Sequence, residues 1–365
     1  MSIREKLKIL RSWYEKYERH LSSLALLIGF VIDNLTLTRI DLWLDNLILF
    51  SYLALSFLGI ILINFYKDSI PSNKILAQLA IYSPLLVQFA FGGLFSGLVI
   101  FYVRGASISV SWPFILILLG LLIGNEFLRD KYHRLVFQLN VFFIALFSFL
   151  IFYVPIVVGE MGVFVFILSG ILSISLMRGV IYLLQLITPL QIYHNKKRIF
   201  LSILGVFFVI NLFYFLNIIP PLPLSLKQIG VYHYVEREDS TGYVLKKEEE
   251  SWCEKFLSGR EIHIKEGEPL YVFSSIFAPT KLETEVAHKW YYYDPQVDEW
   301  KDRACIEYPI VGGRNEGYRG YTFNKNLREG KWRVDVISAD GRLIGRINFG
   351  IEMVDKAPNL ETIYK

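Results

Sequence analysis

The sequence is poor in charged residues and in recognisable catalytic motifs. Charged side chains make up only 20% of its 365 residues, whereas 53% are hydrophobic, which excludes an ordinary soluble enzyme of this size. It contains no Gly-x-Ser-x-Gly, His-Glu-x-x-His or Cys-x-x-Cys motif and no phosphate-binding loop. We therefore expect no catalytic residue, cofactor, metal ion or nucleic-acid partner, and an integral membrane protein rather than an enzyme.

The sequence also lacks a cleavable signal peptide. Residues 1–20 form a charged amphipathic segment without the apolar core that such a peptide needs. We therefore expect this segment to stay in the cytoplasm and the first hydrophobic helix to direct the chain to the membrane.

Long apolar runs fill the chain up to about residue 219. A run of about 20 apolar residues spans the ~30 Å hydrocarbon core of a bilayer at ~1.5 Å rise per residue. The sequence therefore predicts about seven membrane-spanning helices in contact with lipid. They cover 21–37, 44–66, 75–103, 108–128, 135–158, 163–187 and 199–219.

Basic residues alternate between the loops that connect these runs. They gather before the first run and in every second loop after it, while the remaining loops carry few of them. Because Lys and Arg stay on the cytoplasmic side, the N-terminus is predicted inside and the region after residue 224 outside. In a bacterium this is a multi-pass protein of the inner membrane with a periplasmic or extracellular C-terminal domain.

A few polar residues interrupt the apolar runs. Arg178 lies within the sixth run, and Asn125 and Glu126 lie near the inner end of the fourth. Glu126 and Arg178 either form an ion pair inside the bundle, or lie at the interface with Arg178 reaching the headgroups. The motifs Gly93-xxx-Gly97 and Gly120-xxx-Gly124 predict close helix packing within one bundle.

A polar cluster follows the first run. It contains Asp33, Arg39 and Asp41, and Arg104 is a further candidate member. These residues either line a polar pocket that opens outward or cap a helix before a tight turn, where Asp, Asn and Thr are common.

After the Pro220–Pro223 segment the pattern changes to short alternating strands bounded by turns. About seven strands in roughly a hundred residues favour an all-β, immunoglobulin-like sandwich. Trp290 and Trp332 lie on the apolar faces of two of these strands, and Asp340-Gly341 marks a hairpin turn. The charged run 246–250 reads as a solvated and helical connector.

These patterns predict five consecutive parts of the chain. They are a cytoplasmic segment 1–20, a helical membrane domain 21–219, a tether and connector 220–259, a sandwich 260–356 and a tail 357–365. The predicted strands are 261–265, 270–277, 285–293, 305–311, 320–324, 331–338 and 343–354.

Both cysteines, Cys253 and Cys305, lie in the part predicted outside. An oxidising compartment would allow a disulfide between them, and the alternative is two free thiols.

A glycine-rich stretch, residues 312–322, is the best candidate for a ligand site. Arg314, Tyr318, Arg319 and Tyr321 could present guanidinium and aromatic surfaces to an anionic or glycan ligand. The alternative is a strand crossover in which the arginines pack on the aromatic rings. His288 is a further candidate, although a histidine beside Trp290 is more often a structural residue.

The motifs His288-x-Trp290, 312–322, Gly330-Lys331-Trp332-Arg333-Val334 and 341–349 resemble the C-terminal domain of unknown function 2914 found in bacterial membrane proteins. The membrane half is similar to the same proteins at Asp33 to Asp41 and at Asn125-Glu126. This resemblance implies a bacterial envelope protein, and it carries no catalytic residue because the family has no established activity.

Two functions remain open. In the first, the outer sandwich binds a partner protein or a glycan and the helices anchor it. In the second, the protein is a transporter or a membrane-embedded enzyme that uses the polar residues of the bundle.

Overall fold

A computed structural model describes most of the chain. The residues described are 27–37, 39–68, 74–105, 108–127, 134–238, 242–248, 260–280, 282–314 and 317–365. The chain divides into a helical unit, made mostly of residues before 216, and a β unit. The β unit consists of Leu216–Lys365 together with the short segments Val103–Trp112 and Val154–Phe166.

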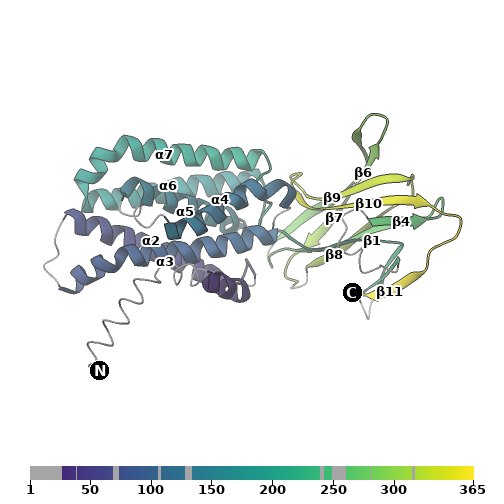
Figure 1. Cartoon of the computed structure of the whole chain (residues 1–365), viewed down its shortest axis with the longest axis horizontal. Coiled ribbons are helices and arrows are strands. Elements are labelled where there is room, and N and C mark those ends of the chain that lie inside the picture. The colour runs from purple at the N-terminus through teal and green to yellow at the C-terminus, as the bar shows by residue number, and fades with distance from the viewer. Residues whose placement is uncertain are drawn as a thin grey trace, which may run out of the picture. The chain divides into compact units, whose positions relative to one another are not determined.

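Seven helices form the N-terminal part of the described chain (Figure 1). They are Leu27–Thr36, α2 Trp43–Asp68, α3 Lys74–Gly105, α4 Ile108–Phe127, α5 Leu135–Val158, α6 Val163–Ile187 and α7 Pro189–Phe215. Five of them, α2, α3, α5, α6 and α7, contain segments long and apolar enough to cross a membrane. The predicted bundle of about seven apolar helices is therefore confirmed, but five of the seven, and not all, are long enough to span a membrane. The first predicted run is described only from Leu27 onward.

The last helix differs from its prediction at both ends. It begins at Pro189 instead of Ile199, so the basic residues 196–198 lie within it. Proline favours the first position of a helix because its missing N–H would be unpaired there, which explains this start. The helix ends at Phe215, and Asn217 follows with a φ of 58°, a left-handed conformation that terminates helices.

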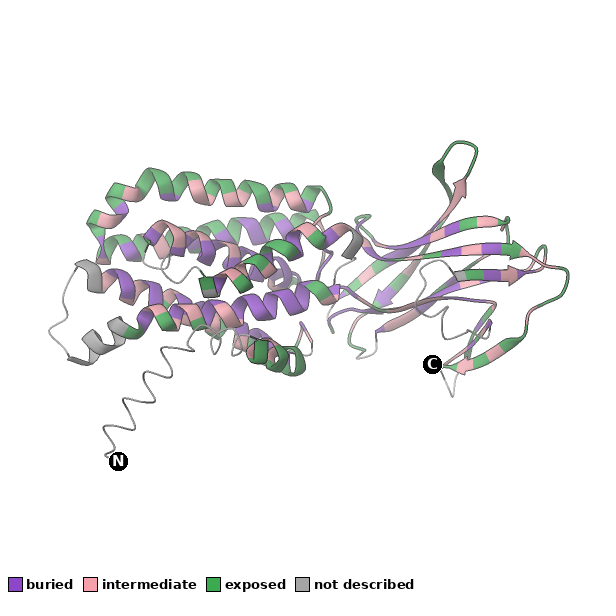
Figure 2. Cartoon of the chain, in the orientation of Figure 1, coloured by how far each residue is buried: buried purple, intermediate pink, exposed green. Residues whose placement is uncertain are grey.

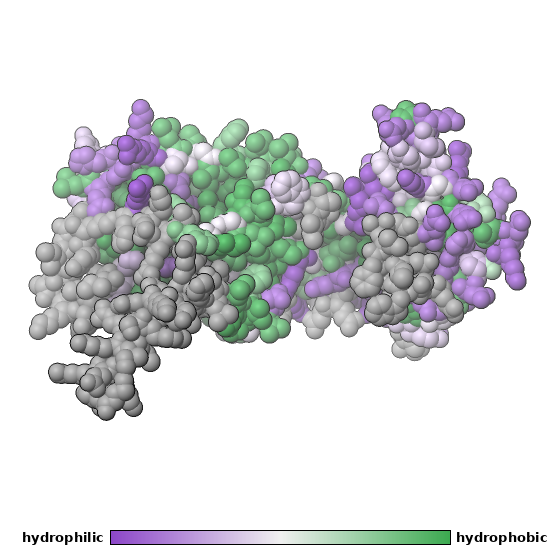
Figure 3. Space-filling view, viewed as in Figure 1, coloured by the Kyte–Doolittle hydropathy of each residue, from purple (hydrophilic) through white to green (hydrophobic). Residues whose placement is uncertain are grey.

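Burial distinguishes the centre of the helical unit from its surface (Figure 2). In α5, 72% of the most apolar segment is buried, whereas in α7 only 17% is. The exposed side chains of α7 include Phe200, Leu204 and Phe208. Figure 3 shows hydrophobic side chains over the middle of the helical unit, and mostly hydrophilic ones over the β unit. Helices that expose apolar side chains in this way have lipid as their natural surroundings.

Small residues bring α2 and α3 close together. A Cβ atom added at Gly93 would lie 2.5 Å from the Tyr52 ring, and one at Gly97 would lie 2.5 Å from Leu49. The predicted packing role of this glycine motif is confirmed. Gly120 of the second motif has no heavy atom within 4 Å of an added Cβ, so the prediction is wrong for this residue.

Polar side chains link helices inside the unit. Asn64 of α2 donates a hydrogen bond of 2.7 Å to Gln138 of α5, and both side chains are fully buried. Asn140 of α5 donates one of 2.9 Å to the hydroxyl of Ser202 on α7. Amide side chains commonly join helices in this way in membranes, so these residues hold α2, α5 and α7 together.

The β unit contains eleven described strands. They are β1 Ser225–Tyr232, β2 Tyr234–Glu238, β3 Gly242–Glu248, β4 Arg260–Ile264, β5 Leu270–Phe277, β6 Glu283–Asp294, β7 Glu299–Val311, β8 Tyr318–Asn324, β9 Gly330–Ser338, β10 Leu343–Met353 and β11 Leu360–Tyr364. Strands β4 to β10 match the seven predicted strands, with differences at their ends.

Two sheets form the sandwich, in the orders β1-β5-β8 and β4-β10-β9-β6-β7. The ladder between β4 and β10 is parallel, and the other ladders in these sheets are antiparallel. Thus β1 and β5 belong to the first sheet, whereas β4, which lies between them in sequence, belongs to the second sheet and pairs with β10. This order is that of an immunoglobulin-like sandwich, so the predicted fold class is confirmed.

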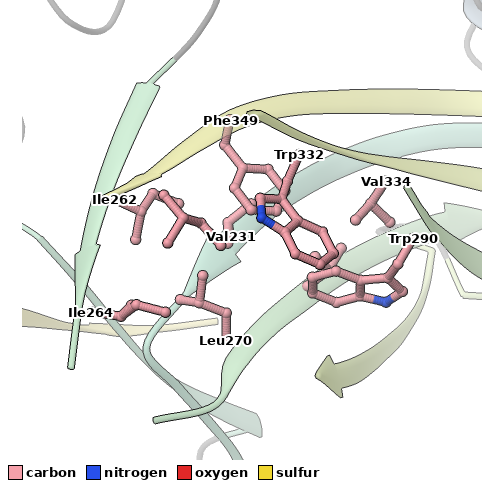
Figure 4. Close-up of a cluster of buried hydrophobic side chains, with 10 residues drawn as sticks. Val231, Ile262, Ile264, Leu270, Trp290, Trp332, Val334 and Phe349 are labelled. Carbon is pink, nitrogen blue, oxygen red and sulfur yellow. The ribbon is translucent and has the colours of Figure 1, made fainter. Parts of the chain in front are cut away.

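The sandwich core lies between the two sheets (Figure 4). Trp290 of β6 and Trp332 of β9 are its largest side chains, and each is at most 1% exposed. Phe349 of β10 packs edge-on against Trp290, and Val272 of β5 belongs to the same cluster. Both tryptophans were predicted on apolar strand faces, and the alternation of β9 places Trp332 inside as expected.

A third, smaller sheet packs on the outer face of β5. Its order is β11-β3-β2, and Val235, Leu245 and Ile363 from its strands pack against Phe273. Residues 246–248 therefore belong to a strand and not to the helical connector that was predicted. Strands β1 to β3 fall in the range predicted as tether and connector, and β11 falls in the predicted tail.

Candidate functional site

Aromatic residues gather on the outer face of the β1-β5-β8 sheet. In β5 and β8 alternate residues point inward to the core, which leaves Tyr271, Tyr321 and Phe323 on the outer face. Tyr271 is the cross-strand partner of Phe323. Tyr321 is 37% exposed and Phe323 is 48% exposed. Large exposed apolar side chains gathered in this way mark interaction surfaces more often than single ones do.

Tyr271 is the centre of this cluster. Its ring centroid lies 5.6 Å from that of Phe323, 6.0 Å from that of Tyr321 and 6.2 Å from that of Tyr234 on β2. Tyr243 of β3 adjoins the cluster at 6.2 Å from Tyr321. We call Tyr234, Tyr271, Tyr321 and Phe323 the aromatic row.

A lysine stands at each end of the aromatic row. The Nζ atom of Lys246 lies 5.4 Å from the Tyr234 ring, and that of Lys325 lies 6.0 Å from the Phe323 ring. Such distances allow cation–π attraction. The hydroxyl of Tyr234 donates a hydrogen bond of 2.7 Å to Glu236, which raises the pKa of that tyrosine.

The predicted residues of the glycine-rich stretch lie along β8 and just before it. Arg314 is exposed, and its guanidinium lies 5.1 Å from the ring of Tyr318, which is half-buried against the core. The backbone carbonyl of Arg319 accepts a hydrogen bond of 3.0 Å from Tyr243. Of the predicted residues, Tyr321 thus belongs to the aromatic row, whereas Arg314 and Tyr318 pair with each other.

Backbone conformation and close contacts explain why glycine occupies positions 312 and 317. Gly317 has a φ of 88°, and an added Cβ would lie 2.7 Å from the Ser275 hydroxyl. At Gly312 an added Cβ would lie 1.7 Å from the carbonyl oxygen of Pro279. The glycines therefore let the chain pass close to β5 as it approaches β8.

His288 lies in the core rather than on a surface. Its Nε2 atom lies 2.9 Å from the hydroxyl of Ser274 and 3.1 Å from that of Tyr308, while Nδ1 lies 2.9 Å from Thr322. Burial lowers the pKa of His288 to about 3, so the ring is neutral at physiological pH. Trp290 donates a further hydrogen bond to Thr322 at 3.3 Å. This network joins the two sheets of the sandwich.

A second histidine cluster surrounds Glu248 at the end of β3. One carboxylate oxygen lies 2.8 Å from Nε2 of His233, and the other lies 3.0 Å from Nδ1 of His263 on β4. The backbone amide of His263 also donates a hydrogen bond of 2.8 Å to Glu248. Burial alone would raise the pKa of this carboxyl, but these bonds lower it to about 2. Among the described residues, no group of three or more Asp, Glu, His or Cys is arranged to hold a metal ion.

The polar cluster after the first helix forms a capped turn. The Arg39 guanidinium donates hydrogen bonds of 3.0 and 2.7 Å to the two oxygens of Asp41. The backbone amide of Arg39 donates to Asp45, in the first turn of α2, at 3.1 Å. Asp33 is half-buried near the end of its helix. Sequence reasoning missed Asp45, although an acidic residue in a first helical turn is a usual capping signal.

Two further intramembrane candidates, Asn125 and Arg178, have side chains that the structure describes. Asn125 of α4 donates a hydrogen bond of 2.8 Å to the backbone carbonyl of Gln88 on α3, which links these two helices. Arg178 is exposed on α6. The side chain of Glu126 lies outside what the structure describes, so its pairing with Arg178 stays a prediction.

The predicted disulfide also stays a prediction. Cys305 is exposed on β7, and Cys253 lies outside the described residues.

One comparison with known proteins matches part of the sandwich. Residues 283–351 match the family model described as protein of unknown function (DUF2914). The matched segment runs from β6 to β10 and contains His288, Trp332 and the glycine-rich stretch. It confirms the resemblance seen in the sequence for this region. For the helical part, the support for a membrane protein comes from its apolar helices.

Other comparisons add little. No curated protein matches the chain. A β-glucosidase from Listeria innocua in complex with isofagomine is 12% identical with a TM-score of 0.19, and the match covers 33% of this chain and 17% of the glucosidase. The Pseudomonas fluorescens alkylpurine DNA glycosylase AlkC is 10% identical with a TM-score of 0.21, and the match covers 86% of this chain and 99% of AlkC. These TM-scores are too low to indicate a shared fold.

Sequence reasoning missed most of the aromatic row. Tyr271 and Phe323 alternate with buried residues on strands that were predicted, so the period of two could have found them. Tyr234 gave no such signal because β2 lay in a range read as a tether.

Proposed function

We propose that this protein is a multi-pass protein of the bacterial inner membrane whose β-sandwich lies outside the cytoplasm and binds a glycan or a partner protein. The helices anchor the sandwich. The membrane assignment is supported by five helices that are long and apolar enough to cross a bilayer. It is also supported by the DUF2914 match, because the sequence resembles bacterial membrane proteins that carry this domain.

The orientation is supported by the distribution of basic residues. Lys67 and Lys74 flank the loop between α2 and α3, and Lys196, Lys197 and Arg198 lie near the start of α7. The loop between α5 and α6 contains Glu160 and no basic residue. With the basic side in the cytoplasm, α7 runs outward and the sandwich emerges on the opposite side of the membrane.

The aromatic row is the observation that carries the binding function. Tyr271, Tyr321 and Phe323 stand on the outer face of the β1-β5-β8 sheet, whose inner face already forms the core, and Tyr234 stands on β2 of the third sheet. Tyr234, Tyr321 and Phe323 are exposed, so the core of the sandwich is formed without them. Exposed tyrosines are typical of binding surfaces because they offer a large rigid area and a hydroxyl for hydrogen bonds.

The polar residues of the bundle favour an anchor over the transporter or embedded-enzyme alternative. Asn64 with Gln138, and Asn125 with the carbonyl of Gln88, form hydrogen bonds between helices. Such pairs stabilise helix packing in lipid.

Two experiments test this function. Alkaline phosphatase fused after residue 365 should be active, because the enzyme folds only outside the cytoplasm; an inactive fusion would contradict the orientation. A photo-crosslinking amino acid at position 321 should capture an envelope component in living cells, whereas the same residue at position 300, on the other sheet, should not. Equal labelling at both positions, or none at 321, would contradict binding through the aromatic row.

A further inference from the structure

The aromatic row and its lysines form a continuous series. It runs from Lys246 over Tyr234 to Tyr271 and then to Phe323, where Lys325 closes it. The ring centroids within it are 6.2 and 5.6 Å apart. The Tyr234 and Tyr271 rings meet edge to face at 64°, and the Tyr271 and Phe323 rings are tilted by 40°. The series is therefore a row of inclined aromatic rings with a lysine at each end.

The scaffold fixes this line before any ligand binds. Tyr271 and Phe323 are paired in register on neighbouring strands, and Tyr271 packs against the buried cluster around Phe273. Tyr234 stands on β2, which pairs with β3 from Tyr234 to Glu238. Because the backbone holds the rings in place, a ligand loses little free energy in ordering them.

The faces of sugar rings suit such a line. Their C–H groups carry a small positive charge and stack on the negative face of an aromatic ring, while their hydroxyls reach outward to polar groups. Because neighbouring rings are 6.2 and 5.6 Å apart and inclined by 64° and 40°, a sugar chain that stacks on them must twist from one sugar to the next. The tyrosine hydroxyls at the edges of the rings provide hydrogen-bonding groups.

The lysines indicate that the sugar chain is acidic. Among the described residues, neither Lys246 nor Lys325 forms an ion pair, so both ammonium groups remain available to an anion. Glu236 accepts a hydrogen bond from the hydroxyl of Tyr234 at the same end of the row as Lys246. Carboxylates of a bound chain would form charge-assisted hydrogen bonds with the two lysines.

We propose that the aromatic row binds an acidic polysaccharide, with its sugar rings stacked on Tyr234, Tyr271 and Phe323 and its anionic groups paired with Lys246 and Lys325. This proposal rests on the proposed function and names the class of ligand. Binding should weaken as salt is added, because salt screens exposed charges.

The test uses the full chain purified in detergent and a panel of polygalacturonate, alginate and hyaluronate. Methyl-esterified polygalacturonate is the uncharged control, since it keeps the sugar ring and loses the charge. We expect at least one acidic polymer to bind, and its affinity to fall about tenfold when Phe323→Leu removes a stacking ring. The double variant Lys246→Gln with Lys325→Gln should lose the preference for polygalacturonate, or for the other acidic polymer that binds, over the uncharged control. Trp300→Ala and Lys331→Gln, on the other sheet, are matched controls that should bind normally.

The outcomes separate this proposal from the general function. If position 321 captures a protein in cells and no acidic polymer binds, the polysaccharide proposal is wrong and the partner function stands. If the polymers bind but the row variants bind as well as the Trp300→Ala control, the site is wrong. If nothing is captured at position 321 and no polymer binds, both proposals fall. Unchanged melting of each variant shows that a lost affinity is not a loss of folding.

Discussion

The ring of Tyr308 occupies the space next to Gly320, where an added Cβ atom would lie 2.5 Å from its Cε2 atom. Tyr308 stands on β7 and Gly320 on β8, which belong to different sheets. From this position the Tyr308 hydroxyl lies 2.6 Å from that of Ser274 and 3.1 Å from Nε2 of His288. Among the described strands, β7 and β8 are edge strands of their sheets. The glycine at position 320 thus leaves room for a ring that joins the two sheets at these edges.

We expect Gly320→Ala to destabilise the sandwich by about 1 to 3 kcal/mol, because the methyl group overlaps the Tyr308 ring and overpacks the core. Thermal unfolding of the full chain in detergent, followed by protease resistance of the sandwich, measures this loss. In a Tyr308→Ala background the same substitution should have almost no further effect. An equal loss in both backgrounds would show that the ring is not the cause.

Trp332→Ala should cost about 3 to 5 kcal/mol, since it removes a large side chain that is 1% exposed and leaves a cavity. It also removes the hydrogen bond of 2.8 Å from the indole to the carbonyl of Arg328. The comparison is Trp300→Ala, whose side chain is 37% exposed and should matter much less. Chemical denaturation of the full chain distinguishes them, and similar midpoints would contradict the core assignment.

The Glu248 cluster predicts a dependence of stability on pH. Its pKa of about 2 in the folded chain lies below the ordinary value of 4.5, so the carboxylate stabilises the fold above about pH 5. This contribution, at most about 3 kcal/mol, is lost as the pH falls through 4.5 towards 2. The melting difference between wild type and Glu248→Gln should therefore be largest between about pH 5 and 6.5, where Glu248 is ionised and His263, whose pKa it raises, is protonated. The difference should shrink in acid, as Glu248 takes up a proton, and at higher pH, as His263 loses one. A constant difference from about pH 6 to pH 3 would argue against this role of Glu248.

Local patterns were enough to predict the helices and most strands. The period of two put Trp332 inside, and Gly341 of the predicted turn has a φ of 77° between β9 and β10. Both features depend on residues that are neighbours in sequence. The strand at 246–248 was read as a connector because its charged residues hid a pairing with β2 and β11.

The candidate site was harder to predict because it depends on pairing between distant segments. Tyr321 was named from its own stretch, but Tyr271 and Tyr234 join it only through the register of β8 on β5 and the packing of β2 on that sheet. His288 was named as a candidate although it is buried, because its burial also depends on contacts between distant segments.

The pairing of β4 with β10 and of β3 with β11 has a consequence for biosynthesis. In both ladders a strand from the first half of the β unit pairs with one of the last two described strands, β10 or β11. Contacts between distant residues form slowly, because a long loop must first close. If the sandwich is exported, the translocon would pass it as an open chain, and envelope chaperones would meet its unpaired β3 and β4 edges until β10 and β11 have followed.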